Sequence, residues 1–555
     1  MQRLVLSPLR RVFPRLIPPP PSREKHHEQD VYQRGFYRRF RTVVTWCVTW
    51  RKTVIAVTLG VFALAIVGFG FVQQQFFPSA NRPELVVDLW LPNGASIEAT
   101  DAEAKRFEKL LAADPDIESF VVYVGGGSPR FYLPLDQQLN NANLAEFVVT
   151  TKSNQVRDQV GKRLLETLDN EFTLLRGRVN PLQNGPPVAY PVQFRVSGPD
   201  YTKIREIAWQ VAEVVKANQN MMHVHLDWNE LSKVVKLEID QNKARLIGST
   251  SEGLSNVLHS ILSGFSITQF RERDKLIEVL ARAEPKERLS LDDIRDINVP
   301  TQSGRWVPLS QVANISYAFE EGVVWRRNRV PTITVQGDIF GSVQAPVVTS
   351  QLNPKIAEIR AKLPPGYTIE VGGATEEAAR GQDSVNAVVP IALLTVITLL
   401  MIHLQSVSKT ILVLLTAPLG LIGVALFLLV FNVPFGFVAM LGFIALFGMI
   451  MRNAIILVDQ IDQDAAGGHP LWTAIIESTV RRFRPIMLTA AAAILAMIPL
   501  TRSNFWGPMA VAIMGGLLVA TLLTLLFLPA LYAAWFRVKR PVGPPSDGHP
   551  ASTSA

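Results

Sequence analysis

The sequence predicts a membrane α-helical protein with six transmembrane helices, arranged as one plus five, and a large α+β insertion after the first helix. Three observations support this prediction. Six predominantly apolar segments approach the ~20 residues that a helix needs to cross a ~30 Å hydrocarbon core. The stretch between the first and second segments, residues 78–384, is rich in polar and charged residues. Within that stretch, strand and helix patterns alternate in a repeated order.

Composition supports the same class. Of the 555 residues, 48% are hydrophobic and 18% are charged, whereas about a quarter of the residues of a soluble domain are usually charged. The net charge of +8 comes from basic residues clustered beside the apolar segments, which indicates contact with lipid headgroups and not with nucleic acid. The single cysteine, Cys47, excludes an intramolecular disulfide framework and a cysteine-rich metal site.

The six candidate spans set the topology. They are about 53–73, 385–404, 411–431, 435–460, 485–501 and 508–536. All strongly basic flanks fall on one side of the membrane if both termini are cytoplasmic, so we expect residues 78–384 outside the cytoplasm. The flanking basic residues are Arg38, Arg39, Arg41, Arg51, Lys52, Lys409, Arg481, Arg482, Arg484, Arg537, Lys539 and Arg540.

The insertion consists of successive strand, helix and strand patterns. The first round has a strand at 84–91, a helix at 96–112, strands at 117–124 and 145–151, and a helix at 154–170. The second round has a strand at 191–198, a helix with apolar residues on one face at 204–215, and strands at 221–228 and 233–240. A third block spans about 234–323, and a last strand, helix and strand end at 367–373. Units of this length and spacing predict several small α+β sandwiches of the ferredoxin-like βαβ type.

One arginine, Arg452, lies inside the fourth span, in "GMIMRNAIILVDQ" (448–460). A guanidinium keeps its proton in a protein and costs at least ~2.5–3.5 kcal/mol at the bilayer centre. Either the side chain snorkels to the headgroups, or it faces inward to meet a carboxylate of another helix in an ion or proton relay. No span offers that carboxylate at matching depth. Asp459 lies two turns further along, ~10 Å away, and Asp383 lies near the outer mouth of the second span.

The start of the fifth span is a second candidate. Arg482 and Thr489 are seven residues apart and therefore share a helical face. The Thr489 hydroxyl either relays a hydrogen bond or bonds back to its own helix, and taken alone the second interpretation is favoured.

A glycine loop in the insertion is a third candidate. Gly125, Gly126 and Gly127 precede Phe131 and Tyr132, and the loop either lines an apolar binding cleft or is a plain surface loop. No Lys-Ser/Thr pair follows the glycines, which argues against a nucleotide site. The sequence has no Ser/His/Asp arrangement and no convincing set of metal ligands, so we assign no catalytic residue and no metal site.

These features resemble one half of a resistance–nodulation–division (RND) exporter, which has one helix, a periplasmic insertion and then five helices. Four stretches are similar, in order, to motifs of that family's second half: "FFPSANRPELVVDLWLPNGAS", "GMIMRNAIILVD", "RRFRPIMLTA" and "MGGLLVATLLTLLFLPALY". The resemblance covers roughly residues 35–540. It implies the C-terminal half of an exporter of hydrophobic and amphiphilic compounds, driven by the proton gradient and needing no cofactor.

The resemblance also implies a proton relay. It would consist of Arg452, where the family usually has lysine, with Arg482 and Thr489, supported by Asn453 and Asp459 on the helix of Arg452. Arginine and lysine differ in hydrogen-bond geometry, so the exchange need not be conservative. The family's partner for this cation is a pair of adjacent aspartates in the first half, and no span of this chain has an Asp-Asp pair. The glycine loop falls where the family has a substrate-gating loop.

The implied organisation has five parts. They are a basic, proline-rich segment (1–34), a cytoplasmic lead-in with the first transmembrane helix (35–77), periplasmic pore and docking subdomains (78–384, docking at about 234–323), a five-helix bundle (385–536) and a cytoplasmic tail (537–555). The stretch "LVLSPLRRVFPRLIPPPP" loosely resembles the end of the preceding half, so we expect the reading frame to begin near the family midpoint.

The implied partners follow from the family. They are the missing N-terminal half, two further protomers of a homotrimer, a periplasmic adaptor protein, an outer-membrane channel and the lipid bilayer of the bacterial inner membrane, with no nucleic acid. Two other interpretations stay open, a six-helix protein-export subunit with the same helix plan and a transport-inactive remnant. Metal-ion export is less favoured because no intramembrane methionine or carboxylate ladder occurs, although Met449 and Met451 keep it open.

Overall fold

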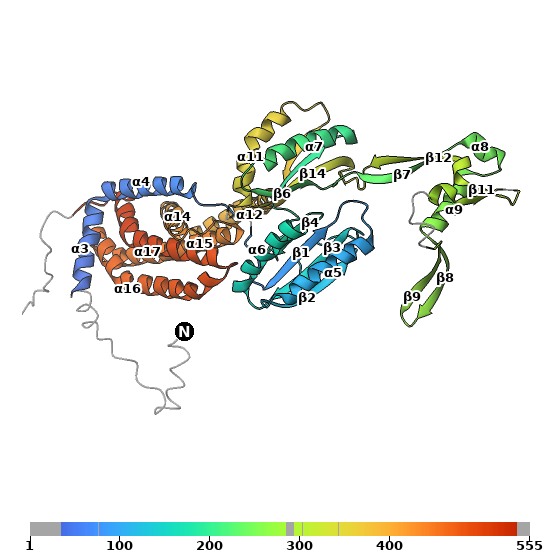
Figure 1. The fold of residues 1–555 in the computed structure, drawn as a ribbon. Coiled ribbons are helices and arrows are strands. Elements are labelled where there is room, and N and C mark those ends of the chain that lie inside the picture. The colour runs from blue at the N-terminus through green and yellow to red at the C-terminus, as the bar shows by residue number, and fades with distance from the viewer. Residues whose placement is uncertain (1–34, 76, 285–292, 302, 342, 541–555) are drawn as a thin grey trace, which may run out of the picture.

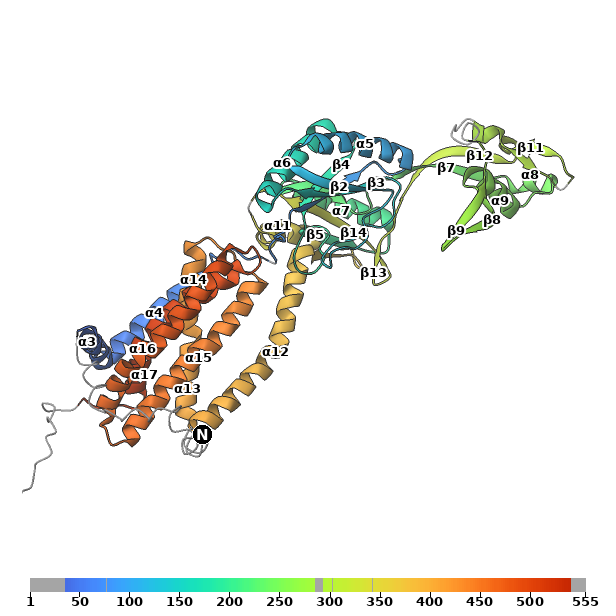
Figure 2. The ribbon, with the colours of Figure 1, turned by 90° about the horizontal axis from the view of Figure 1, so that it is seen from below.

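Long apolar helices form one end of the molecule and mixed α/β subdomains form the other (Figures 1 and 2). The computed structural model describes residues 35–75, 77–284, 293–301, 303–341 and 343–540. The expected segment 1–34 and the tail beyond residue 540 lie outside these residues. Within them, six helical runs are long and apolar enough to cross a membrane. They are α4 (Arg51–Phe69), α12 (Gly373–Leu404), α13 (Val407–Thr416) continued by η3 (Ala417–Leu419) and α14 (Gly420–Val430), α15 (Phe437–Ala466), α16 (Leu471–Met497) continued by η4 (Ile498–Arg502), and α17 (Gly507–Trp535).

Two of these helices begin well before the apolar segments that predicted them. Helix α12 begins at Gly373 instead of about 385, because its polar first turns extend the helix outward from the bundle. Helix α16 begins at Leu471 instead of about 485 and continues through Pro485. Apolarity marks only the part of a helix that lies in lipid, and interior proline is tolerated in transmembrane helices.

Helix α17 lies at the centre of the bundle and packs against α14, α15 and α16. Glycines bring α14 and α17 into close contact: a Cβ atom added at Gly423 would collide with the backbone of Gly515 and Gly516. Small residues allow this close approach. In lipid there is no hydrophobic driving force between helices, so close packing of this kind holds them together.

A helix that the sequence did not predict, α3 (Phe36–Thr49), crosses the end of the bundle away from the sheets, which we call the distal end (Figure 1). It buries Val44, Cys47 and Val48 against α16 and α17. Arg41 of α3 forms an ion pair with Glu477 of α16 at 2.8 Å. At the start of α4, the Arg51 guanidinium donates to the carbonyl oxygens of residues 533 and 538, each at 2.7 Å.

The first α/β subdomain has a four-stranded antiparallel sheet of β1 (Glu84–Trp90), β2 (Ile117–Val124), β3 (Leu144–Thr151) and β4 (Arg176–Pro181), in the order β2-β3-β1-β4. Helices α5 (Ile97–Ala113) and α6 (Asn154–Glu171) enclose a core with Phe107, Phe147 and Phe172. Alternating residues of β1, such as Leu85, Val87 and Leu89, face this core. The order is the one expected for a βαββαβ unit.

The second α/β subdomain repeats this order. Strands β5 (Val192–Ser197), β6 (Met221–Leu226), β14 (Val330–Ile339) and β15 (Thr368–Gly372) pair as β6-β14-β5-β15, with β13 (Arg326–Arg327) also paired to β14. Helices α7 (Tyr201–Lys216) and α11 (Ala345–Arg360) complete it, and Trp228 is fully buried in its core. Most elements of the two units coincide with strands and helices expected from the sequence, but β4 was not expected and the expected strand at 233–240 lies outside the second sheet.

The third block differs from the expected sandwich. Strands β7 (Ser232–Ile239) and β12 (Ala313–Glu320) pair as a two-stranded arm that leads away from the second sheet to a small lobe (Figures 1 and 2). The lobe has short helices and two-stranded pairs, and every position of its two hairpin strands is exposed. Its elements are α8 (Gln241–Leu246), α9 (Ser251–Leu262), β8 (Phe265–Glu272), β9 (Lys275–Ala281), η1 (Asp293–Asp296), β10 (Asn298–Pro300), β11 (Trp306–Pro308) and η2 (Leu309–Gln311).

Helix α12 joins the second sheet to the bundle without a loop, because it begins at the residue after β15. Glu376 in its first turn forms ion pairs with Arg195 of β5 and with Arg327 of β13, the latter at 2.9 Å. Figure 2 shows the helix running from the sheet toward the distal end of the bundle.

Candidate functional site

Arg452 lies on the outer side of α15, in a groove of about 310 Å³ between α15 and α12. The groove is otherwise apolar except for His403 of α12. Arg452 is exposed, and among the described residues its side chain makes no hydrogen bond and no ion pair. A charge on this surface of a membrane-spanning helix therefore has no partner within the described part of the chain.

The two residues expected to support Arg452 point elsewhere. Asn453 follows it directly and is buried, with 3% of its surface exposed, because consecutive helical residues lie about 100° apart around the axis. Asp459 accepts a hydrogen bond from the Gln463 amide at 2.7 Å. In the described residues, no hydrogen bond joins either side chain to Arg452.

The other two relay residues lie on α16. The Thr489 hydroxyl donates to the carbonyl oxygen of Ile486 in its own helix at 2.9 Å, which is the local bond that the sequence favoured. The Nε of Arg482 is buried and has no hydrogen-bond partner among the described residues. The structure therefore does not join Arg452, Arg482 and Thr489, and their role as a relay stays a prediction.

Two aspartates near the distal end of α15 are held by other helices of this chain. Asp464 pairs with Arg481 and accepts a hydrogen bond from Ser478, which ties α15 to α16. Asp462 pairs with Lys409 of α13 at 2.7 Å and accepts from the Tyr532 hydroxyl of α17 at 3.1 Å. The partners of these aspartates could not be read from the sequence, since each partner lies on another helix.

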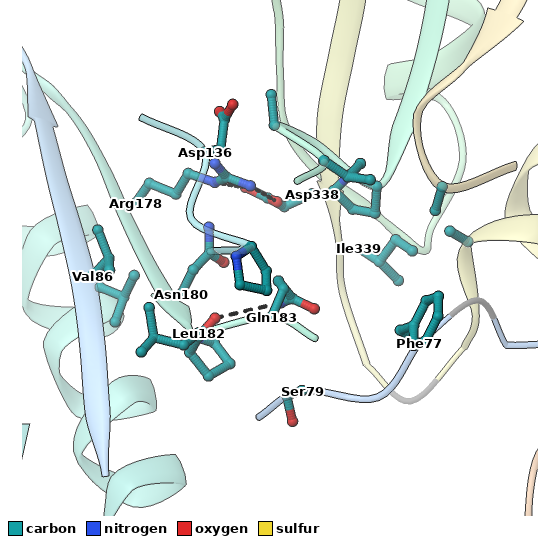
Figure 3. A pocket seen from close by; sticks show the side chains of 18 of the residues that line it. Phe77, Ser79, Val86, Asp136, Arg178, Asn180, Leu182, Gln183, Asp338 and Ile339 are labelled. Carbon is teal, nitrogen blue, oxygen red and sulfur yellow. Dashed lines mark hydrogen bonds and ion pairs between the residues drawn. The ribbon is translucent and has the colours of Figure 1, made fainter. Parts of the chain in front are cut away.

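A cavity of about 530 Å³ lies between the two α/β subdomains (Figure 3). Its first wall is the face of the first sheet that α5 and α6 do not cover. Asp88 of β1 stands opposite Glu146 of β3 and Arg178 of β4, so one row across three strands carries three charged residues. Apolar residues complete the lining, including Val86, Leu182 and Ile339.

Arg178 crosses the cavity to the second subdomain. Its Nε and Nη2 donate to the two carboxylate oxygens of Asp338 on β14, at 2.7 and 2.8 Å. The guanidinium also lies 3.8 Å from the centre of the Tyr190 ring. Both partners of the ion pair are 12% exposed, and a bidentate contact at this burial fixes geometry as well as charge. Figure 3 shows this pair, with Asp136 beside it.

Asp88 is the unsatisfied group of this cavity. It is 5% exposed, and its Oδ1 has no hydrogen-bond partner among the described residues. Burial raises the pKa of Asp88 to about 7; Arg178 opposes this rise and the neighbouring Glu146 adds to it. Burial also raises the pKa of Asp136. A buried carboxyl without a donor favours its neutral form or the arrival of a positive charge.

The cavity as a whole is acidic. Four carboxyl groups line it (Asp88, Asp136, Glu146 and Asp338), whereas Arg178 is the arginine in its lining. An apolar wall beside uncompensated carboxyl groups suits a ligand with an apolar body and a positive charge. The sequence signal that could have located the cavity is Asp88 itself, a charged residue inside the apolar strand "ELVVDLWL".

Residues 19–535 match the AcrB/AcrD/AcrF family. The chain belongs to this family. Its members are RND permeases, a class of efflux transporters. The cobalt-zinc-cadmium resistance protein CzcA of Cupriavidus metallidurans is 24% identical over 484 residues, which are 83% of this chain and 45% of that protein. The multidrug resistance protein MdtC of Salmonella schwarzengrund is 22% identical over 510 residues, 90% of this chain and 49% of that protein.

The fold is that of an RND permease. The crystal structure of a heavy metal efflux pump (crystal form II) superposes with a TM-score of 0.75 at 21% identity, over 90% of this chain and 52% of that one. The chain thus spans about half the length of the curated relatives it matches. Relatives named for metal resistance and for multidrug resistance both match, so the family alone does not assign a substrate.

The glycine loop, expected to line an RND substrate cleft, is packed in place. A Cβ on Gly126 or Gly127 would meet Asn140 or Gln138 of the same loop. Phe131 is exposed, and the Tyr132 hydroxyl donates to the Asn184 side chain at 3.0 Å. None of the five predicted residues lines the 530 Å³ cavity, although the loop's later residues 134–136 and 138 contribute to it. Their cleft role stays a prediction.

Proposed function

We propose that this chain acts as the C-terminal half of a proton-driven RND exporter of amphiphilic compounds in the bacterial inner membrane. In this proposal both termini are cytoplasmic, six helices span the membrane, and residues 78–384 lie in the periplasm. One observation carries the proposal: Arg452 is exposed in the α12–α15 groove and has no ion pair among the described residues, in a chain that belongs to a family of efflux transporters. A charge so placed needs a carboxylate from a second set of helices.

The coupling step follows from that arrangement. A first half, on the same or another polypeptide, packs against the α12–α15 groove and brings ionised carboxylates to Arg452. A proton arriving from the periplasm neutralises a carboxylate and breaks its ion pair, while Arg452 keeps its own proton throughout. The helices then change position, and loss of the proton to the cytoplasm restores the pair. Arg482 and Thr489 would serve as the next polar groups along this route.

The cavity between the subdomains supports an amphiphilic, positively charged substrate. Its volume of about 530 Å³ falls within the ~300–1,000 Å³ usual for small-molecule sites. The Oδ1 atom of Asp88 has no hydrogen-bond partner among the described residues, and Val86, Leu182 and Ile339 offer apolar surface. Movement of the substrate would require the Arg178–Asp338 contact to change, because this pair bridges the two subdomains that bound the cavity.

The proposed assembly is a homotrimer that works with an adaptor protein and an outer-membrane channel. The arm and lobe at residues 232–320 extend away from the bundle, which supports a docking role at that end. Exposed apolar residues of the lobe hairpin, such as Phe265, Phe270 and Leu280, provide surface for a partner.

Metal-ion export is a second candidate, favoured by the names of CzcA and of the superposed heavy metal pump. The cavity carboxyl groups would be the ligands. Against this candidate, no group of three or more His, Cys, Asp or Glu side chains is placed to hold a metal ion in the described residues. We therefore favour the organic cation.

Efflux assays in cells separate these functions. The chain is expressed alone and together with a first half that carries an intramembrane Asp pair. We measure export of a lipophilic quaternary ammonium dye, with Zn²⁺ and Co²⁺ tolerance alongside. We expect dye export only with the first half, and its loss on adding a protonophore.

Three results would contradict the proposal. Export by the chain alone would refute the need for a first half. Metal tolerance without dye export would select the metal candidate. An assembled complex that moves neither class would leave a protein-export or scaffold role.

A further inference from the structure

Helix α3 has a surface chemistry that the transport proposal does not use. Its buried face packs on α16 and α17, and the rest of the helix divides into two flanks. One flank is mainly apolar, with Phe36, Val43, Trp46 and Trp50 between 45% and 58% exposed; the exposed Arg39 shares this flank, because it lies four residues before Val43. The other flank is polar and carries Arg38 and three threonines. Apolar and polar flanks side by side are typical of a helix that lies in the membrane interface.

A groove of about 390 Å³ follows the boundary between the two flanks. Arg38, Arg41, Trp46 and Trp50 line it, together with Thr42, Thr45 and Thr49. The groove lies at headgroup level, because α4 begins at the very next residue after Trp50 and Arg51 is bonded to the end of α17. Figure 1 shows α3 turning directly into α4 at the distal end of the bundle.

The lining of the groove carries two arginines and no carboxyl group. The Arg38 side chain makes no hydrogen bond or ion pair within the described ranges, and the Nε of Arg41 is buried without a partner. The three threonine hydroxyls donate to carbonyl oxygens of their own helix at 2.7 to 3.0 Å. The indole N–H groups of Trp46 and Trp50 add further donors. Such a groove calls for an anion attached to an apolar body.

We propose that this groove binds an anionic phospholipid, with the phosphate between Arg38 and Arg41 and the acyl chains against Trp46 and Trp50. Glu477 takes part of the charge of Arg41, so Arg38 supplies the uncompensated cation. Basic residues near the membrane attract anionic lipids of the cytoplasmic leaflet, and tryptophan favours the headgroup level. Binding would anchor α3 and, through Arg41–Glu477 and the buried Cys47 face, the distal ends of α16 and α17.

The test uses the full chain in lipid nanodiscs with spin-labelled lipids. We compare the association of phosphatidylglycerol and phosphatidylcholine for the unmodified protein, Arg38→Gln, Trp46→Leu and Arg502→Gln. The last variant is the matched control, since Arg502 is also an exposed arginine but lies at the opposite end of the bundle. Size-exclusion profiles and circular dichroism check that each variant is folded.

We expect phosphatidylglycerol to associate about fivefold more strongly than phosphatidylcholine, on the basis of ~1 kcal/mol per basic residue near the surface. Arg38→Gln should remove this preference, Trp46→Leu should weaken association of both lipids, and Arg502→Gln should change neither. Equal association of the two lipids, or an equal loss in Arg502→Gln, would overturn the proposal. Displacement of the lipid by inorganic phosphate would mean that the groove holds a free anion instead.

Discussion

Arg452 illustrates how a single side chain can depend on residues outside its own chain. It lies on a membrane-spanning helix, in an apolar groove, with no carboxylate in contact among the described residues. Asp462 and Asp464, the acidic residues further along α15, are occupied by Lys409 and Arg481. The carboxylate partner must therefore come from elsewhere if Arg452 carries charge in transport.

The first prediction concerns this charge. With a first half present, Arg452→Gln should reduce proton-coupled dye export at least about tenfold, because loss of one charge from a buried ion pair costs several kcal/mol. Arg452→Lys should retain a substantial fraction, since the cation remains. Lys539→Gln, which removes an exposed charge at the distal end, is the control. The measurement is the initial efflux rate normalised to the membrane level of each variant; unchanged export in Arg452→Gln would return this residue to a snorkelling role.

The second prediction concerns Asp88 and pH. Because burial raises the pKa of Asp88 to about 7, the carboxyl is mostly neutral near pH 6 and mostly ionised near pH 8. The affinity for a quaternary ammonium probe should then rise about tenfold between about pH 6 and about pH 8, following the ionised fraction. Asp88→Asn should remove this dependence, whereas Glu118→Gln on the exposed side of β2 should keep it. Fluorescence titration of the purified protein measures the affinity.

The raised pKa of Asp88 also determines how the stability of the folded protein changes with pH. The folded state holds the Asp88 proton more tightly than the unfolded chain, whose carboxyl titrates near pH 4. The protonated Asp88 therefore makes its full contribution to the free energy of unfolding below about pH 4, and this contribution is lost as the pH rises to about 7. Asp88→Asn should flatten this decline in a thermal-unfolding series, and a decline of equal slope in the variant would contradict the assignment.

At the scale of elements, the α14–α17 contact depends on the absence of side chains. A Cβ at Gly423 would meet backbone atoms of α17, which cannot rotate away, whereas a Cβ at Gly60 of α4 would meet nothing within 4 Å. Gly423→Ala should therefore destabilise the bundle by about 3 kcal/mol, the upper range for overpacking, and Gly60→Ala should be neutral. Thermal unfolding in detergent, followed by size-exclusion chromatography, provides the comparison. Equal thermal-unfolding midpoints for the two variants would show that α14 and α17 can move apart to accept the methyl group without loss of stability.

Periodicity predicted most elements but not their full extents. Most strands and helices of the two βαββαβ units were readable because each has one buried face, but β4 was missed and the strand at 233–240 was grouped with the second unit although it forms the arm. Helix α3 was not, since its buried face of Val44, Cys47 and Val48 lies among arginines and threonines that do not resemble a span. The predicted starts of α12 and α16 were too late in the sequence. Each helix begins with polar turns outside the apolar segment, and hydropathy does not indicate those turns.

The candidate sites show the same limit. Arg452 was found from the sequence because a charge in an apolar run stands out. The cavity row of Asp88, Glu146 and Arg178 was not found, because those residues are brought together only by strand register. The glycine loop was singled out by composition; in the structure Gly126 and Gly127 pack closely against Asn140 and Gln138, and Gly125 against Ile97.

At the scale of the whole molecule, one side of the helix bundle, formed by α12 and the Arg452 groove, is only loosely packed against the other helices. Helix α12 contacts the other helices sparsely, and its residues 386–395 are all exposed. This side includes the Arg452 groove, which supports it as the surface that receives the first half. The opposite arrangement, in which lipid covers this side, would leave Arg452 in hydrocarbon without a counter-ion.

Cross-linking tests this arrangement. Gly448→Cys places a thiol in the Arg452 groove, and Leu488→Cys places one on the exposed side of α16. The natural Cys47 is buried and should not react. A cysteine-to-cysteine linker should join Gly448→Cys, and not Leu488→Cys, to a first half with a cysteine on its acidic helix. Cross-linking from both positions, or from Leu488→Cys alone, would place the partner elsewhere.

The junction between β15 and α12 has a mechanical consequence. A flexible loop would absorb movement, but here the helix starts at the sheet and is clamped by Glu376 to Arg195 and Arg327. The part of α12 before Pro390 is about 25 Å long at 1.5 Å per residue, and a proline inside a helix is a usual place for it to bend. A tilt of ~5° about the clamp would move the end of this part by ~2 Å by the same geometry. Movement of the second sheet is thus passed directly to the outer part of α12, and Pro390 is the point at which the helix can bend.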